Sequence, residues 1–192
     1  MPLRVTFELS DKDLRHFRSI MRHARHAARK TPEKKIVASA RKLAAAVEAA
    51  EVPDFVRERL AHLPKLVAML EDREWSLSGD NRDRIVSALA YFNEPVDLIP
   101  DSVPGLGFID DAIMVELVVT ELRPDIEAYD DFCAFRRKLD GRRKSAAARP
   151  AEAQASLEAR RRDLHARMRR RRMRRRSARQ RTPSSTRPFS LF

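Results

Sequence analysis

Residues 95–111 read PVDLIPDSVPGLGFIDD, and this stretch decides how the chain is organised. It combines three prolines, two glycines and four aspartates with an apolar framework. Pro95, Pro100 and Pro104 each fix one backbone dihedral, whereas Gly105 and Gly107 permit conformations that other residues resist. The apolar residues between them provide surface that can pack on a core. We therefore expect an ordered structural turn between two core helices.

The segments on both sides of this turn have the spacing of helices. Asp80 is predicted to cap a helix that ends before Pro95. After the turn, Asp110 or Asp111 is predicted to cap a helix through Leu122, and this helix has almost no polar face. A helix that is apolar on nearly all sides is usually central to its domain, so we place it in the core.

Further helix boundaries follow from caps and prolines. Ser10 and Asp13 form a weakened capping box at the start of a first helix, because the usual third residue is Glu or Gln. Pro64 is predicted to kink or split a helix that starts near residue 53. Pro124 is predicted to open a last globular helix that ends near Gly141. With a short strand expected at residues 3–8, the predicted fold class is an all-α, compact multi-helix domain with a basic C-terminal extension.

The string ALAYFNEPVDLIPDSVPGLGFIDDAIMVELV, at residues 88–118, resembles the signature of the YkvA-like family (domain of unknown function 1232). The family pattern is a helix, a Pro-x-Asp-Leu-Ile-Pro-Asp segment, and then a Gly and a paired Asp that open an apolar helix. The matching positions here are Pro95, Asp97, Leu98, Ile99, Pro100, Asp101, Gly107, Asp110 and Asp111. The resemblance covers about residues 85–122 and implies an architecture, not a reaction. Some relatives have a following helix that looks membrane-embedded, whereas Glu116 and Glu121 make this one look soluble.

The net charge of +12 hides a strong segregation along the chain. Residues 1–50 carry a net charge of +7, residues 51–140 carry −10, and residues 141–192 carry +15. These blocks match the predicted organisation: basic N-terminal helices (1–50) packing on an acidic helical core (51–140), followed by an Arg-rich tail (141–192) that is partly helical or disordered. Each block would meet a different partner, and the two signs can also attract each other within the chain.

The composition also indicates a compartment. The single cysteine, Cys133, cannot form an internal disulfide, which is typical of a reducing compartment. The N-terminus has no apolar run after a basic start, so it does not resemble a secretory signal. The longest apolar-rich stretch, residues 112–122, is about half the length needed to span a bilayer. We expect a soluble, cytoplasmic protein with no transmembrane segment.

The four aspartates of the turn are the one constellation that could carry chemistry. Asp97, Asp101, Asp110 and Asp111 lie within fifteen residues, and oxygen-rich sites suit Mg²⁺, Ca²⁺ or Mn²⁺. The simpler interpretation is that they satisfy backbone donors at turns and helix starts. The alternative is that the four aspartates bind a divalent cation. Catalysis by such a metal is a third and weaker interpretation.

Other chemistry has little support in the sequence. The histidines of the first helix, His16, His23 and His26, lack a further ligand for zinc and fit a solvated basic helix. Cys133 lies at an apolar helical position and is predicted to be part of the core. The chain has no Ser/His/Asp motif, phosphate-binding glycine loop or dinucleotide fingerprint. We assign no catalytic residue.

The tail is the clearest interaction feature, because residues 167–181 read RMRRRRMRRRSARQR. Its candidate polyanion-binding residues are Arg167, Arg169, Arg170, Arg171, Arg172, Arg174, Arg175, Arg176, Arg179 and Arg181. Counterion release would drive binding to nucleic acid without sequence recognition. An anionic membrane surface, an acidic protein and the acidic middle of this same chain are the alternatives.

These observations predict a non-enzymatic helical interaction module with a polyanion-binding tail. One alternative is a divalent-metal-dependent enzyme that acts on phosphates through the Asp cluster. It lacks a recognisable general base or nucleophile. The other alternative is a protein that associates peripherally with a membrane through its tail.

Overall fold

A computed structural model describes residues 9–93, 108–144 and 150–181, and these residues form an all-α fold, as predicted. The described ranges contain helices and no strand. The predicted strand at residues 3–8 lies outside the described residues. Residues 95–107 of the predicted turn lie outside them as well, and these include Pro95, Pro100, Pro104, Gly105 and Gly107.

The first helix, α1 (Asp11–Ala27), begins at the predicted capping box. The Ser10 hydroxyl accepts a hydrogen bond from the Asp13 N–H at 3.3 Å, and the Asp13 carboxylate accepts one from the Ser10 N–H at 2.9 Å. Aspartate therefore replaces the usual glutamate, because its shorter side chain still reaches the backbone of Ser10. The chain then forms a short 3₁₀ helix, η1 (Ala28–Lys30), before α2 (Glu33–Ala49).

The predicted break near Pro64 is confirmed. The segment forms two helices, α3 (Asp54–Leu60) and α4 (His62–Glu71). Proline at position 64 has no N–H to donate to the carbonyl of Leu60, and its ring crowds that carbonyl, so the helix divides there. Both parts place apolar residues in the core, including Val56, Leu60, Leu63 and Leu66.

The loop between α4 and α5 is ordered around one carboxylate. Asp72 accepts hydrogen bonds from the N–H groups of Glu74 and Trp75, both at 3.0 Å, and from the Tyr129 hydroxyl at 3.1 Å. It also pairs with Arg136 at 2.8 Å. These contacts hold the fully buried Trp75 side chain against the centre of the protein.

Helix α5 (Asp80–Leu89) begins one residue away from the predicted cap. Gly79 is the N-cap, with φ +51°, and Asp80 is the first helical residue. Glycine fits this position because a side chain is strained at positive φ. The carboxylate of Asp80 still lies in the first turn, where it complements the positive end of the helix. The 3₁₀ helix η2 (Ala90–Asn93) follows.

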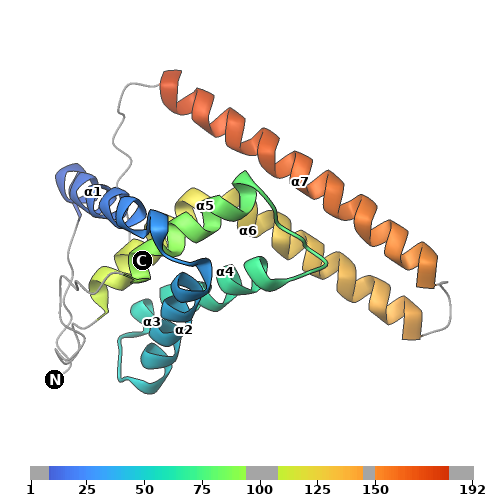
Figure 1. Ribbon diagram of the computed structural model, residues 1–192, viewed down its shortest axis with the longest axis horizontal. Helices are drawn as coiled ribbons and strands as arrows, with labels where there is room; N and C mark the ends of the chain where they lie inside the picture. The colour runs from blue at the N-terminus through green and yellow to red at the C-terminus, as the bar shows by residue number, and fades with distance from the viewer. Residues whose placement is uncertain (1–8, 94–107, 145–149, 182–192) are drawn as a thin grey trace.

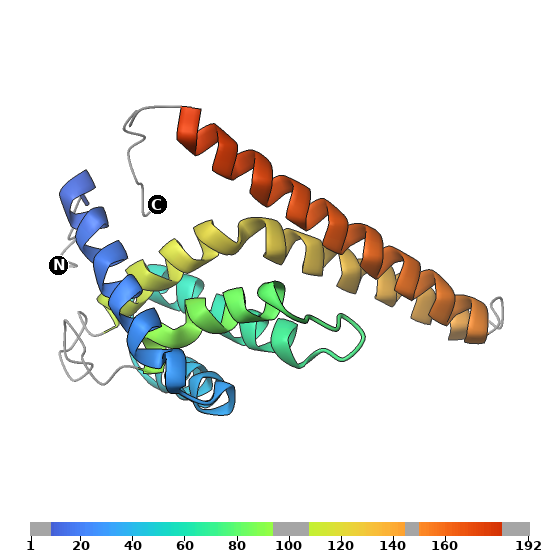
Figure 2. The same ribbon diagram turned by 45° about the horizontal axis from the view of Figure 1, so that its top comes forward.

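Helix α6 (Ile109–Lys144) corrects two predictions. Neither Asp110 nor Asp111 is the cap, because the helix begins at Ile109 and both aspartates lie in its first turn. The helix also does not end before Pro124: it continues through the proline for 36 residues in all and bends along its length (Figure 2). Side chains from other helices stabilise the continuous helix near the proline by donating to its carbonyl groups.

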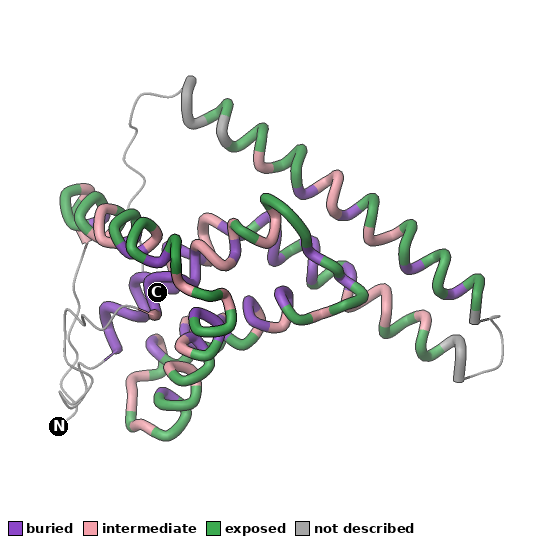
Figure 3. The backbone as a smooth tube through the Cα atoms, viewed as in Figure 1, coloured by how far each residue is buried: buried purple, intermediate pink, exposed green. Residues whose placement is uncertain are grey.

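Helix α7 (Pro150–Arg181) runs back along the second half of α6, so that the two form a long hairpin projecting from the other helices (Figures 1 and 2). One continuous apolar core joins residues from α1 to α7. Figure 3 shows buried positions recurring along one side of α7. The prediction that the folded part ends near Gly141 was therefore wrong, because a predicted tail segment contributes to the core.

Candidate functional site

A narrow apolar stripe fixes α7 on the protein. Ala153, Leu157, Leu164 and Met168 recur every three to four residues or a multiple of that spacing, and they are at most 6% exposed. Side chains at this spacing lie on one side of a helix. The stripe contacts α6 and orients every arginine of the helix, because rotation of α7 about its axis would expose these apolar residues.

One set of arginines in α7 pairs with the acidic second half of α6. Arg171 lies 2.5 Å from Glu127, and Arg167 lies 3.6 Å from Asp131. Arg172 binds the carboxylate of Asp125 through two nitrogens, with an Nε–Oδ2 distance of 3.1 Å. The basic tail thus docks on the acidic middle of its own chain, which was one of the alternatives left open by the sequence.

A second set of arginines points to solvent. Arg162, Arg170 and Arg174 are exposed, and they make no ion pair or hydrogen bond within the described ranges. We call these three residues the outer arginine face. Their guanidinium groups are open to a partner, whereas those of the paired set already contact carboxylates of α6. Of the other predicted residues, Arg169 and Arg175 line a cleft described below, and the side chains of Arg176, Arg179 and Arg181 lie outside the described part.

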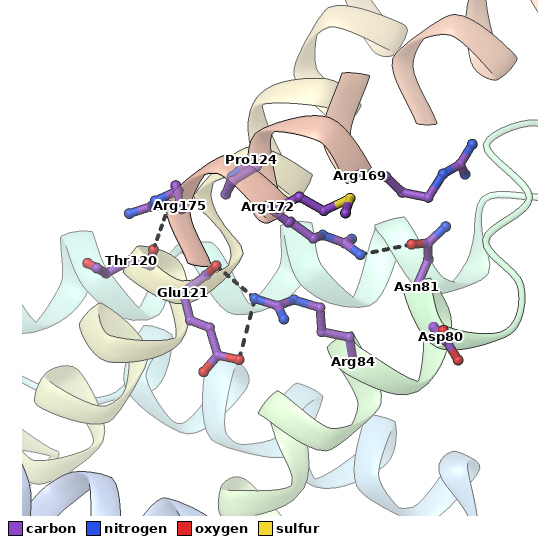
Figure 4. A pocket seen from close by; sticks show the side chains of 10 residues that line it. Asp80, Asn81, Arg84, Thr120, Glu121, Pro124, Arg169, Arg172 and Arg175 are labelled. Carbon is purple, nitrogen blue, oxygen red and sulfur yellow. Dashed lines mark hydrogen bonds and ion pairs between the residues drawn. The ribbon is translucent and has the colours of Figure 1, made fainter. Parts of the chain in front are cut away.

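Pro124 creates a second feature next to α7. A proline in a helix leaves the carbonyl four residues earlier without its usual N–H donor, which here is the carbonyl of Thr120. Arg175 from α7 donates to this carbonyl at 3.3 Å. Arg84 from α5 donates to the next carbonyl, that of Glu121, at 3.2 Å. Two arginines therefore stabilise the bend, and they contact adjacent carbonyl groups of α6 (Figure 4).

A cleft of about 810 Å³ opens at this bend between α5, α6 and α7. We call it the α5–α7 cleft. Figure 4 shows Arg84 of α5 and Arg172 of α7 at it, with Arg175 reaching to Thr120 and Arg169 extending away from the other three. Its lining residues are Asp80, Asn81, Arg84, Thr120, Glu121, Pro124, Arg169, Arg172, Met173 and Arg175. Arginine is therefore its most frequent lining residue.

The electrostatics of the cleft centre on Arg172. Burial and, after it, the positive charge of Arg84 lower the pKa of Arg172 to about 10, while Asp80 opposes the shift. At neutral pH the guanidinium remains charged, and its two-point contact with the fully buried Asp125 favours that state. Its Nη1 also donates to Asn81 at 2.9 Å. The guanidinium groups of Arg84 and Arg172 thus lie close together in a partly buried part of the cleft.

The predicted aspartate site is only half described. Asp110 and Asp111 are 2% and 7% exposed in the first turn of α6, whereas Asp97 and Asp101 lie outside the described residues. In the ranges that the structure covers, no group of three or more His, Cys, Asp or Glu side chains is arranged to hold a metal ion. The metal hypothesis for the four aspartates therefore stays a prediction.

A buried ring contact also joins α7 to the core. The His165 ring meets the Trp75 ring edge-on, with 4.3 Å between centroids. Burial, followed by the charges of Arg161 and Arg169, lowers the pKa of His165 to about 4. The histidine is therefore neutral at physiological pH. Cys133 is half-buried and packs against the core, as its apolar position predicted.

Sequence reasoning identified the arginines of the tail but missed the cleft. Arg84 carried no signal, because it lies far from the tail in sequence and belongs to a helix with mixed charges. Pro124 was visible, but it was interpreted as a helix start. A proline preceded by an uninterrupted apolar helix and followed by helical spacing would have indicated a bent helix with an unsatisfied carbonyl.

Comparison with known proteins places this all-α chain in a class of proteins described as of unknown function. A family model described as "Protein of unknown function (DUF1232)" matches residues 84–117. An "Uncharacterized membrane protein YkvA" from Bacillus subtilis (strain 168) is 31% identical over 77 residues, which cover 37% of this chain and 71% of the relative. The chain belongs to this YkvA-like family, as the resemblance at residues 85–122 indicated. The search of solved structures gave no match.

The relative's name calls it a membrane protein, so the comparisons do not confirm the expected cytoplasmic location. Within residues 9–93, 108–144 and 150–181, no helix combines the length and apolar character needed to cross a bilayer.

Proposed function

We propose that this protein is a non-enzymatic helical module that associates peripherally with an anionic membrane surface through the outer arginine face of α7, on the cytoplasmic side. The observation that carries the proposal is the division of the α7 arginines into a paired set and an unpaired set. Arg167, Arg171 and Arg172 are neutralised by acidic residues of α6. The outer face is left to interact with something else.

The geometry of the outer face supports a flat partner. Arg162, Arg170 and Arg174 span about 18 Å of the helix axis at a rise of about 1.5 Å per residue. Met173, at 71% exposure, is the exposed large apolar side chain of the described part of the chain. Basic residues with an apolar neighbour on one helix face are typical of helices that lie on a lipid surface.

The name of the relative favours lipid over nucleic acid as the polyanion, since that protein is called a membrane protein. The cytoplasmic leaflet is the anionic one, and a basic residue near it contributes about 1 kcal/mol. The three arginines together would contribute about 3 kcal/mol, which gives weak, reversible and salt-sensitive binding.

Vesicle sedimentation tests the proposal. The full chain is mixed with phosphatidylcholine vesicles with or without 30% phosphatidylglycerol, at about 0.05 M and about 0.5 M salt. We expect binding to the anionic vesicles at low salt and its loss at high salt. The double variant Arg170→Gln/Arg174→Gln should weaken the partition about 30-fold, because about 2 kcal/mol is removed.

The matched control is Arg15→Gln/Arg18→Gln, which removes two exposed arginines from α1 instead. It should lower the partition much less if the outer face makes the contact. An equal loss in both double variants would mean that net charge alone drives binding. Tighter binding of duplex DNA than of vesicles at equal phosphate concentration would replace lipid with nucleic acid as the ligand.

A further inference from the structure

We propose that the α5–α7 cleft is a binding site for an organic phosphate monoester. This site uses other arginines than the outer arginine face, and Met173 borders both. It lies between helices, whereas the outer face points to solvent, and it uses Arg84, Arg169, Arg172 and Arg175. The phosphate could belong to a lipid headgroup or to a soluble metabolite, and the chemistry of recognition is the same for both.

The backbone of α6 assembles the cleft. Pro124 leaves the Thr120 carbonyl without a helical donor, and Arg175 occupies that carbonyl at 3.3 Å. The contact holds the guanidinium of Arg175 at the rim of the cleft instead of leaving it free in solvent. Arg84 is held in the same way by the carbonyl of Glu121 at 3.2 Å. The cationic groups are thus positioned before any ligand arrives, which lowers the entropic cost of binding.

Hydrogen-bond donors remain unused at this place. The Nε of Arg84 is buried and has no hydrogen-bond partner within the described ranges. Arg169 makes no ion pair or hydrogen bond in the same ranges, although it lines the cleft. Guanidinium groups present several N–H donors in a planar fork, which matches the oxygens of a phosphate group. A phosphate in the cleft would therefore meet the unused donors of Arg169, whereas the Arg84 Nε, which solvent does not reach, would be satisfied only after a small movement of that side chain.

The charge of the cleft fits a dianion. Its lining contains four arginines and two carboxylates, Asp80 and Glu121, so the lining has a net charge of +2. The partners behind the lining do not change this value, because Asp125 pairs with Arg172 and Arg25 pairs with Glu121 at 2.8 Å. A phosphate monoester carries about −1.5 to −2 at neutral pH. It would also screen the repulsion between Arg84 and Arg172.

The size of the cleft indicates more than inorganic phosphate. A volume of about 810 Å³ lies within the usual range of about 300–1,000 Å³ for small-molecule sites. Pro124 and Met173 add apolar surface to the lining, where the organic part of a ligand could pack. A monoester that carries a small organic group uses both the arginines and this apolar surface.

Titration calorimetry of the full chain with sn-glycerol 3-phosphate tests the site, with chloride at matched ionic strength as the blank. We expect saturable binding that weakens at least about tenfold in Arg169→Gln/Arg175→Gln, since two charge-assisted contacts are lost. The outer-face variant Arg170→Gln/Arg174→Gln removes the same charge and should bind within about twofold of the parent chain. The outer-face variant should lose binding only in the vesicle assay, so failure of the proposed function and failure of this site are distinguishable.

Vesicles distinguish the two sources of the phosphate. Vesicles with phosphatidic acid present a monoester, whereas those with phosphatidylglycerol present a diester at similar surface charge. A preference for phosphatidic acid that depends on Arg169 and Arg175, and that glycerol 3-phosphate competes away, assigns the site to a lipid headgroup. Saturable glycerol 3-phosphate binding without that preference assigns it to a soluble organic phosphate.

A second pair of variants keeps the test valid if the arginine variant fails to fold. Met173→Glu places a carboxylate at the cleft on an exposed residue, whereas Ser177→Glu places one a turn further along α7. The first should weaken glycerol 3-phosphate binding more than the second. The proposal is overturned if glycerol 3-phosphate shows no saturable binding and phosphatidic acid is not preferred. Equal losses in the cleft variants and their controls would overturn it as well.

Discussion

Replacing Arg172 with methionine should strongly destabilise the protein, whereas the same change at its neighbour Arg171 should not. The carboxylate of Asp125 is fully buried, and the side chain of Arg172 is 17% exposed. Arg172→Met leaves that carboxylate in the interior without its counter-charge. By contrast, the side chains of Arg171 and its partner Glu127 are 48% and 51% exposed, so solvent screens both charges.

The expected magnitudes differ clearly. Removing one partner of a buried ion pair costs about 3–5 kcal/mol, and the partial exposure of Arg172 places it near the lower value, about 3 kcal/mol. Loss of an exposed pair costs about 0–1 kcal/mol. The double variant Asp125→Leu/Arg172→Met should recover most of the loss, because it removes both charges and leaves apolar groups in their place.

Urea unfolding measured by circular dichroism gives these free energies of unfolding. Fluorescence of Trp75 adds a local signal, because its ring contacts His165 of α7. If α7 detaches before the other helices unfold, the fluorescence of Arg172→Met will change at lower urea than its ellipticity. A loss in Arg172→Met no larger than that in Arg171→Met would refute the conclusion that the Asp125 pair is a buried attachment of α7.

Three further predictions concern the packing and pH dependence of the fold. Burial lowers the pKa of His165 to about 4, so the folded protein should lose stability as pH falls from about 6.5 towards 4. The expected loss is about 1–2 kcal/mol after allowance for solvent screening. His165→Phe should flatten this pH profile of the unfolding free energy, measured by urea titrations at several pH values. Leu164→Ala should cost about 2–5 kcal/mol of unfolding free energy because the side chain is fully buried, whereas Met173→Ala, at an exposed position of the same helix, should cost less than about 0.5 kcal/mol. Asp72→Ala should lower the free energy of unfolding by about 2–3 kcal/mol in calorimetric or urea unfolding, because its carboxylate accepts from two backbone N–H groups, the Tyr129 hydroxyl and the Arg136 guanidinium. A cost below about 1 kcal/mol would show that water replaces the carboxylate.

Local signals predicted much of the helical part. Ser10 and Asp13 define the start of α1 because a capping box depends only on residues three apart. Pro64 divides α3 from α4 because a proline acts on the carbonyl four residues before it. Such effects are complete within one turn of helix, so the sequence contains all the information that they need.

The same rule applied to Pro124 gave a wrong boundary. Both prolines remove one backbone donor, but at Pro124 a distant arginine occupies the carbonyl that is left. Arg175 is 51 positions away from Pro124, and no local pattern connects them. A proline can therefore end a helix or bend it, and tertiary contacts decide which outcome occurs.

By itself, the sequence determined the all-α class, the family, the segregation of charge and the presence of many arginines in the tail. These properties follow from periodicity, motif and composition, each of which is local or additive along the chain. Only the tertiary structure decided which arginines are neutralised, such as Arg172 by Asp125, and which remain available, such as Arg170. The reason is physical: Coulomb interactions depend on distance and burial, and the docking of the α7 apolar stripe on α6 sets both for every arginine of the helix.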